Sequence, residues 1–199
     1  IIDSREDSKT DLDVPFYNGA EVSNTFGRQG INSIVVKKNN VENKIEVDCL
    51  AVSGGWNPTL HLTCHMNGRP TWDEKILSFV PEIGAIPNMA VVGASNGFMD
   101  THSCFMSAEK EVSRIIKSSG RTAKTKRLPK AELTKYEIAP KWSVEGKGRA
   151  WLDYQNDVTV KDIQQSVQEN FKSVEHMKRY TTQGMAIDQG KNSNVASLA

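Results

Sequence analysis

The sequence predicts an α/β fold followed by a small helical domain. Two short apolar runs, at residues 50–52 and 89–92, each end in a glycine-bounded turn, which is typical of a buried strand that feeds a loop. Helical spacing of apolar residues follows the second turn, and two more amphipathic segments lie between Thr159 and Gly184. A strand, a glycine turn and a helix offer backbone N–H groups to a phosphate, so composition and spacing indicate an α/β nucleotide-binding fragment.

Three runs are predicted to be strands in the first half of the chain. Alternating apolar residues indicate strands at residues 33–37 and 44–52, joined through a turn at Asn39 and Asn40. The apolar run at residues 89–92 indicates a short buried strand. The order of these runs and the helix that follows them is that of an α/β domain.

The turn VVGASNGFMDT precedes the longest predicted helix. This helix is expected to begin near Asp100 or Thr101 and to stop at Gly120. Gly93 and Gly97 would let the backbone approach a pyrophosphate closely, and Thr101 would cap the helix or bond the ligand. Many strand-to-helix turns carry glycine for geometry alone, so the spacing by itself leaves both interpretations open.

A second small-residue turn, AVSGGWNPT, permits the same two interpretations. Ser53, Gly54 and Gly55 are small enough to skirt a nucleotide. A tight turn with Trp56 packed as a lid on the core explains these residues equally well.

Charge and cysteine content exclude several classes of function. The 199 residues carry a net charge of +1, which gives no reason to expect nucleic acid or an anionic membrane as a partner. No apolar run approaches the roughly 20 residues of a membrane span. The three cysteines are widely spaced and lack a CxxC pair, so a disulfide framework is not expected and a reducing cytoplasm fits best.

Neither a metal site nor a catalytic constellation is predicted. His61, Cys64 and His65 form a loose group in HLTCH, but a zinc site would need four donors and no second ligand pair follows at a useful spacing. The carboxylates Asp100 and Glu111 are most simply explained as parts of a solvated helix face.

The last segment predicts two short helices. Thr159 is the expected N-cap of the first, with Asp162 completing a capping box. Ser173 is expected to start the second, and Gly184 to end it. The chain begins with IIDSRED, as if a strand were already in progress, and stops at NSNVASLA without a closing element, so we expect an excerpt from a longer polypeptide.

Three stretches together resemble the alpha subunit of heterotetrameric sarcosine oxidase. They are DCLAVSGGWNPTLHL, VVGASNGFMDT and the long DYQNDVTVKDIQQSVQENFKSVEHMKRYTTQGMAIDQGKNSN. The resemblance implies the second half of a pyridine-nucleotide-disulfide-reductase-like dinucleotide-binding domain at residues 1–120. A basic linker at residues 121–140 and a small helical domain at residues 141–199, leading into an absent folate-binding, aminomethyltransferase-like domain, would follow.

The resemblance also implies an oxidoreductase and its partners. Sarcosine would be demethylated to glycine, oxygen would become hydrogen peroxide, and tetrahydrofolate would capture the one-carbon unit. The alpha subunit would assemble with beta, gamma and delta subunits in the cytoplasm and would hold NAD. FAD and FMN would belong to the complex, with the flavin chemistry in the beta subunit.

Site residues are implied for the nucleotide alone, and none is catalytic. In the related reductases, a Gly-Asp pair at the second strand–turn–helix meets the sugar or ribityl hydroxyls of the cofactor, and here the pair is Gly93–Ala94. Loss of this carboxylate is consistent with NAD in place of FAD, and also with an empty site. By the resemblance, Ala94, Met99 and Thr101 contact the nucleotide, while Gly93 shapes the turn.

The closing helical segment also resembles a two-iron two-sulfur domain of the bacterioferritin-associated-ferredoxin type. Its four ligand positions fall on Asp153, Gln155, Asp188 and Ser193. None is a thiolate, so the expected module is a scaffold without its cluster. Two alternatives remain open: a subunit of a related amine or opine dehydrogenase, which is disfavoured because the cluster cysteines are missing, and a purely structural segment that binds nothing.

Overall fold

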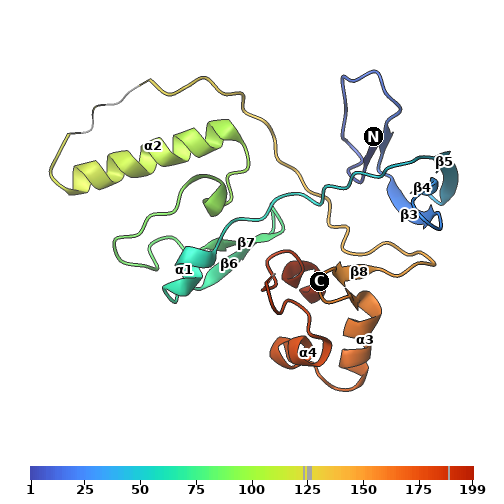
Figure 1. Cartoon of the computed structure of the whole chain (residues 1–199). Coiled ribbons are helices and arrows are strands. Elements are labelled where there is room, and N and C mark those ends of the chain that lie inside the picture. Colours follow the sequence, from blue (N-terminus) through green and yellow to red (C-terminus); the bar gives the residue numbers. More distant parts are fainter. Residues whose placement is uncertain (123, 125–126, 188) are drawn as a thin grey trace. The chain divides into compact units, whose positions relative to one another are not determined.

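The chain divides into two compact units. The computed structural model describes residues 1–122, 124, 127–187 and 189–199 (Figure 1). One unit combines Ile1–Val52 with Ala139–Ala199, and the other is Ser53–Ile138. The division into residues 1–120, 121–140 and 141–199 stays a prediction, and part of the expected linker lies outside the described residues.

A three-stranded antiparallel meander organises the start of the first unit. Strands β3 (Glu21–Phe26), β4 (Ser33–Lys38) and β5 (Val41–Glu46) lie in that order, with β4 in the centre. Strand β1 (Ile2–Asp3) pairs in parallel with β2 (Tyr17–Asn18) beside them. The small core is formed by Ala20, Ile34 and Val36. The strand expected at residues 33–37 is confirmed, because alternation along β4 places Ile34 and Val36 on the buried face.

The strand expected at residues 44–52 is wrong in its second half. β5 ends at Glu46, which pairs with Ser33, the first residue of β4. Beyond this pair β4 offers no further strand residue, so the apolar run continues without a ladder, and Val52 is 82% exposed. Trp56 is 72% exposed, so the expectation that it packs as a lid on the core is also wrong.

The second unit contains a hairpin, a glycine-bounded turn and one long helix. The elements are α1 (His61–His65), β6 (Pro70–Asp73), β7 (Ser78–Pro81), η1 (Gly93–Asn96) and α2 (Thr101–Ser118). α2 confirms the predicted helix, with Gly120 at φ +73 directly after its C-cap. Within the part of the chain that the structure describes, no helix has the length and apolar character needed to cross a membrane.

The short buried strand expected at residues 89–92 is not formed. Val92 is extended, with φ −136° and ψ 166°, but residues 89–92 pair with none of the described strands. An apolar run has the right side chains for a strand, yet it becomes one only where another strand supplies the ladder.

The end of the chain forms a hairpin and three short helices. β8 (Trp151–Asp153) pairs with β9 (Val158–Thr159), and α3 (Val160–Gln168), α4 (Val174–Thr181) and α5 (Asn194–Leu198) follow. The predicted capping box is confirmed, since Thr159 and Asp162 bond each other's backbone N–H. Ser173 is the N-cap of α4, but this helix ends at Thr181, before the expected Gly184, because Thr182 already takes a left-handed conformation with φ +63.

Removing the cap hydroxyl should loosen α3. In Thr159→Ala the Asp162 amide loses its acceptor, so we expect the free energy of unfolding to fall by about 1 kcal/mol. Urea denaturation followed by circular dichroism measures this. Thr134→Ala, at an exposed residue outside helices and strands, is the control, and equal midpoints for the two variants would contradict the role of the cap.

Candidate functional site

The turn at η1 is closed by its own backbone. The Gly97 amide donates to the Ala94 carbonyl at 3.1 Å, and the Phe98 amide donates to the Gly93 carbonyl at 3.2 Å. The Gly93 amide donates to Ser107 Oγ on α2 at 3.1 Å. The predicted turn from Gly93 to Gly97 is therefore confirmed, and part of its set of N–H groups is already used inside the protein.

Backbone conformation explains glycine at both ends of the turn, and packing adds a second reason at Gly97. Gly93 and Gly97 have φ angles of +65 and +86, which side chains rarely adopt. A Cβ atom on Gly97 would lie 3.0 Å from Val80 Cγ1 and 3.2 Å from Ile76 Cδ1. The turn therefore rests on the β6–β7 hairpin with no room for a methyl group, a geometric reason for glycine that needs no ligand.

The four residues proposed for the nucleotide site, three contacts and the turn-shaping Gly93, lie in one segment from η1 to the first residue of α2. Gly93 is buried, Met99 is half-buried, and Ala94 and Thr101 are exposed. The small Ala94 side chain and the Thr101 hydroxyl are thus accessible to a ligand. Nothing in the structure tests whether a nucleotide binds them, and their role stays a prediction.

Asp100, and not Thr101, caps α2. The Asp100 carboxylate accepts a hydrogen bond from the Ser103 amide at 2.9 Å. Hydrogen bonds from the side chain and backbone of Ser103 hold the pKa of Asp100 below its ordinary value. A carboxylate therefore occupies the end of the helix that attracts anions, and the positive N-terminal dipole is already partly neutralised.

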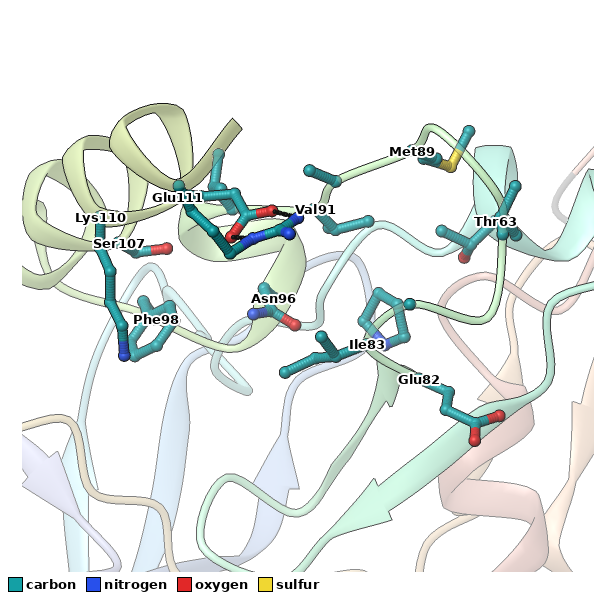
Figure 2. A pocket seen from close by; sticks show the side chains of 16 residues that line it. Thr63, Glu82, Ile83, Met89, Val91, Asn96, Phe98, Ser107, Lys110 and Glu111 are labelled. Atoms are coloured by element: carbon teal, nitrogen blue, oxygen red, sulfur yellow. Dashed lines mark hydrogen bonds and ion pairs between the residues drawn. The ribbon is translucent and has the colours of Figure 1, made fainter. Parts of the chain in front are cut away.

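A cavity of about 510 Å³ lies between α2 and the segment that leads from β7 to η1 (Figure 2). One wall of the cavity carries an ion pair between Arg114 and Glu111. Arg114 Nε and Nη2 donate to the Glu111 carboxylate at 2.9 and 2.6 Å. The lining residues are Thr63, Pro81, Glu82, Ile83, Gly84, Ile86, Met89, Ala90, Val91, Val92, Asn96, Phe98, Ser107, Lys110, Glu111 and Arg114.

None of the four residues proposed for the nucleotide lines this cavity. One signal in the sequence points to this cavity wall, the i, i+3 and i, i+4 spacing of Ser107, Lys110, Glu111 and Arg114 along α2. The opposite wall, at residues 81–86, has no periodic pattern that predicts its position.

The turn at AVSGGWNPT supplies no residue to the lining of the cavity beside α2. Ser53, Gly54 and Gly55 are exposed, and the Trp56 amide donates to the Tyr136 hydroxyl at 3.2 Å. The proposal that these residues skirt a nucleotide has no support from this geometry.

Two of the four positions compared with cluster ligands, Asp153 and Ser193, lie in a buried polar core. Asp153 and Ser193 are each 3% exposed, Gln155 is exposed, and Asp188 lies outside the described residues. Burial raises the pKa of Asp153, but the Asn156 side chain and the backbone amides of Gly184, Asn156 and Gln155 outweigh it, so the pKa is lowered.

These residues do not fit an iron–sulfur cluster, because none of them offers a thiolate. Among the described residues, no group of three or more His, Cys, Asp or Glu side chains is placed to hold a metal ion, and the HLTCH stretch is no exception.

The family model and the curated relatives that match this chain are all of sarcosine oxidase. The model of the Sarcosine oxidase A3 domain matches residues 147–199. The chain is 34% identical over 203 residues to a Sarcosine oxidase subunit alpha of Rhizobium meliloti (strain 1021), covering 100% of this chain and 20% of that protein. It is 36% identical over 164 residues to the subunit of the same name from Corynebacterium sp. (strain U-96), covering 78% of this chain and 17% of that protein.

One solved structure has a similar fold. L-proline dehydrogenase from P. horikoshii matches with a TM-score of 0.63 and 15% identity, over 92% of this chain and 39% of that chain. At this identity the likeness concerns the fold alone, and it agrees with the mixed α/β class that the sequence predicts. The chain spans about a fifth of the length of the curated relatives that it matches.

Adding a methyl group to Gly97 should disturb the turn. In Gly97→Ala the new Cβ meets Val80 at 3.0 Å in a left-handed conformation, so we expect a loss of about 1–3 kcal/mol in unfolding free energy. Urea denaturation measures the loss. Gly54→Ala is the matched control, because its Cβ would meet nothing within 4 Å, and equal stability of the two variants would contradict the packing argument.

Proposed function

Because this chain is a homologue of one segment of sarcosine oxidase alpha subunits, we propose that it binds NAD and joins the nucleotide-binding half of such a subunit to the folate-binding half. The observation that carries this proposal is the 34% identity that extends over the whole chain. The identity spans both the glycine turn and the terminal helical segment, so the two are expected to serve one protein.

The proposed complex is an oxidoreductase of several subunits. It converts sarcosine, oxygen and water to glycine, hydrogen peroxide and formaldehyde, or transfers the one-carbon unit to tetrahydrofolate as 5,10-methylenetetrahydrofolate. FAD and FMN supply the flavin chemistry with the beta subunit, and gamma and delta subunits complete the assembly. This segment carries no catalytic residue, and its part is to bind and to connect.

The proposed nucleotide contacts are Ala94, Met99 and Thr101, with Gly93 shaping the turn. Exposure of Ala94 and Thr101 beside the N-terminus of α2 supports this assignment. Ala94 is exposed, so a dinucleotide can approach it. The amides of Gly93, Gly97 and Phe98 already donate hydrogen bonds within the protein, so they do not serve as donors to the ligand.

The Asp100 carboxylate sets a preference among the parts of the nucleotide. It caps α2 and repels phosphate, whereas it can accept hydrogen bonds from sugar hydroxyls. We therefore place a ribose, and not the pyrophosphate, nearest to this helix end. An added 2′-phosphate would meet this carboxylate, so the site should prefer NAD to NADP.

A purely structural role is the second candidate. It is favoured by the hairpin contact that explains Gly97 without a ligand, and by the Asp100 cap that already occupies the end of α2. In this alternative the turn holds α2 against the hairpin and binds nothing.

Calorimetry on the purified complex that contains this chain distinguishes the two candidates. We expect heat on titration with NAD, at least tenfold weaker binding of NADP, and at least tenfold weaker binding of NAD by Ala94→Glu, which fills the contact surface with a charged side chain. Ala85→Glu, at an exposed alanine outside the proposed contacts, is the control. No heat with NAD or FAD would favour the structural role.

The activity of the complex is tested by its products. We expect sarcosine-dependent hydrogen peroxide, with formaldehyde released when tetrahydrofolate is absent and suppressed when it is present. A complex that reduces an artificial electron acceptor with sarcosine but forms no peroxide would instead indicate a dehydrogenase.

A further inference from the structure

The domain at residues 147–199 has a polar core. Its buried apolar side chains are Val158 and Met177, whereas its buried polar side chains are Asp153, Ser166, Gln183 and Ser193. The apolar core of a domain of this size rarely contributes more than about 3–5 kcal/mol, and small domains commonly add disulfides, metals or other crosslinks. The buried polar residues are therefore candidates for the interactions that stabilise this domain.

Asp153 joins two distant parts of this domain. Its Oδ1 accepts from the amides of Gln155 and Asn156 at 2.9 and 3.1 Å. Its Oδ2 accepts from Asn156 Nδ2 and from the Gly184 amide, both at 2.9 Å. Gly184 lies 31 positions further along the chain, so one carboxylate fixes the end of β8 against the turn after α4.

Gln183 extends the connection to the last helix. Its Nε2 donates to Ser193 Oγ at 2.7 Å, and the Ser193 carbonyl accepts from the Ser197 hydroxyl in α5 at 2.8 Å. Gln183 is fully buried, and its Oε1 has no hydrogen-bond partner among the described residues. The two neighbours Gln183 and Gly184 thus link α5 on one side and β8 on the other.

The glycine at position 184 is required by this arrangement. Gly184 has φ +66, and a Cβ atom there would lie 3.0 Å from Gly190 Cα and 2.6 Å from Asn194 Oδ1. Gly184 therefore packs closely against Gly190 and Asn194, and its left-handed conformation directs the Gly184 amide to Asp153.

We propose that Asp153, Gln183, Gly184 and Ser193 form a hydrogen-bonded polar staple that holds this domain closed without any metal. Two of these residues, Asp153 and Ser193, stand at positions where the resemblance to an iron–sulfur domain implies cluster ligands. Carboxylate, amide and hydroxyl groups bonded to backbone N–H groups and to one another do not suit a cluster, whereas they do suit a crosslink made of hydrogen bonds. The staple connects β8, the turn after α4 and α5.

Hydrogen–deuterium exchange at the Gly184 amide, measured in the full chain, tests the staple. Asp153→Asn keeps the size of the side chain but removes its charge and turns one acceptor into a donor that faces two N–H donors. We expect the Gly184 amide to exchange roughly 10- to 100-fold faster, while the Ser103 amide in the other unit is unchanged. Asp157→Asn, an exposed aspartate of the same domain, should leave both amides unchanged.

A milder variant keeps the test decisive if Asp153→Asn unfolds the domain. Ser193→Ala removes the acceptor of Gln183 Nε2 and should speed exchange at Gly184 about 3- to 10-fold. Gln183→Met should have a smaller effect, because it removes one bond together with an unpaired Oε1. Unchanged exchange at Gly184 in Ser193→Ala would overturn the proposal. So would stoichiometric iron and sulfide in the unmodified chain, if chelating the iron speeds exchange at the Gly184 amide.

Discussion

Asp100, Asp153 and Asp162 each accept hydrogen bonds from backbone N–H groups at a point where one element meets the next. Asp100 begins α2, Asp153 joins β8 to the turn after α4, and Asp162 fixes the start of α3. The buried apolar side chains among the described residues are few: Ala20, Ile34 and Val36 form one small cluster, and Ile76, Val158 and Met177 lie outside it. Directional bonds between side chains and backbone therefore determine much of the local geometry, because each bond specifies an orientation that apolar contact alone does not.

These carboxylate-to-backbone hydrogen bonds also affect the proposed nucleotide site and the terminal domain. At the proposed nucleotide site, the Asp100 carboxylate that caps α2 would also limit which part of a dinucleotide fits there. In the terminal domain, a carboxylate occupies a place that the resemblance implies for a metal ligand. In both places one acidic side chain stabilises the local fold, and its negative charge limits which ligand could bind beside it.

The sequence predicted what depends on local signals. The capping box at Thr159 and Asp162, the helix that stops at Gly120 and the strand at residues 33–37 were confirmed, since each rests on residues only a few positions apart. The runs at residues 47–52 and 89–92 failed as strands, because a strand needs a partner and pairing is not encoded in the run itself. The bond from Gly184 to Asp153 and the cavity beside Arg114 escaped prediction for the same reason, since both join residues far apart in the sequence.

Thr159 is at once the last residue of β9 and the N-cap of α3. Because strand and helix share this residue, the pairing of β9 with β8 and the first turn of α3 restrict the same backbone angles, and the Val160 amide also donates to the Ala150 carbonyl. Contacts over so short a sequence separation cost little loop-closure entropy and form early. A change at Thr159 therefore disturbs the pairing of β9 with β8 and the start of α3 together.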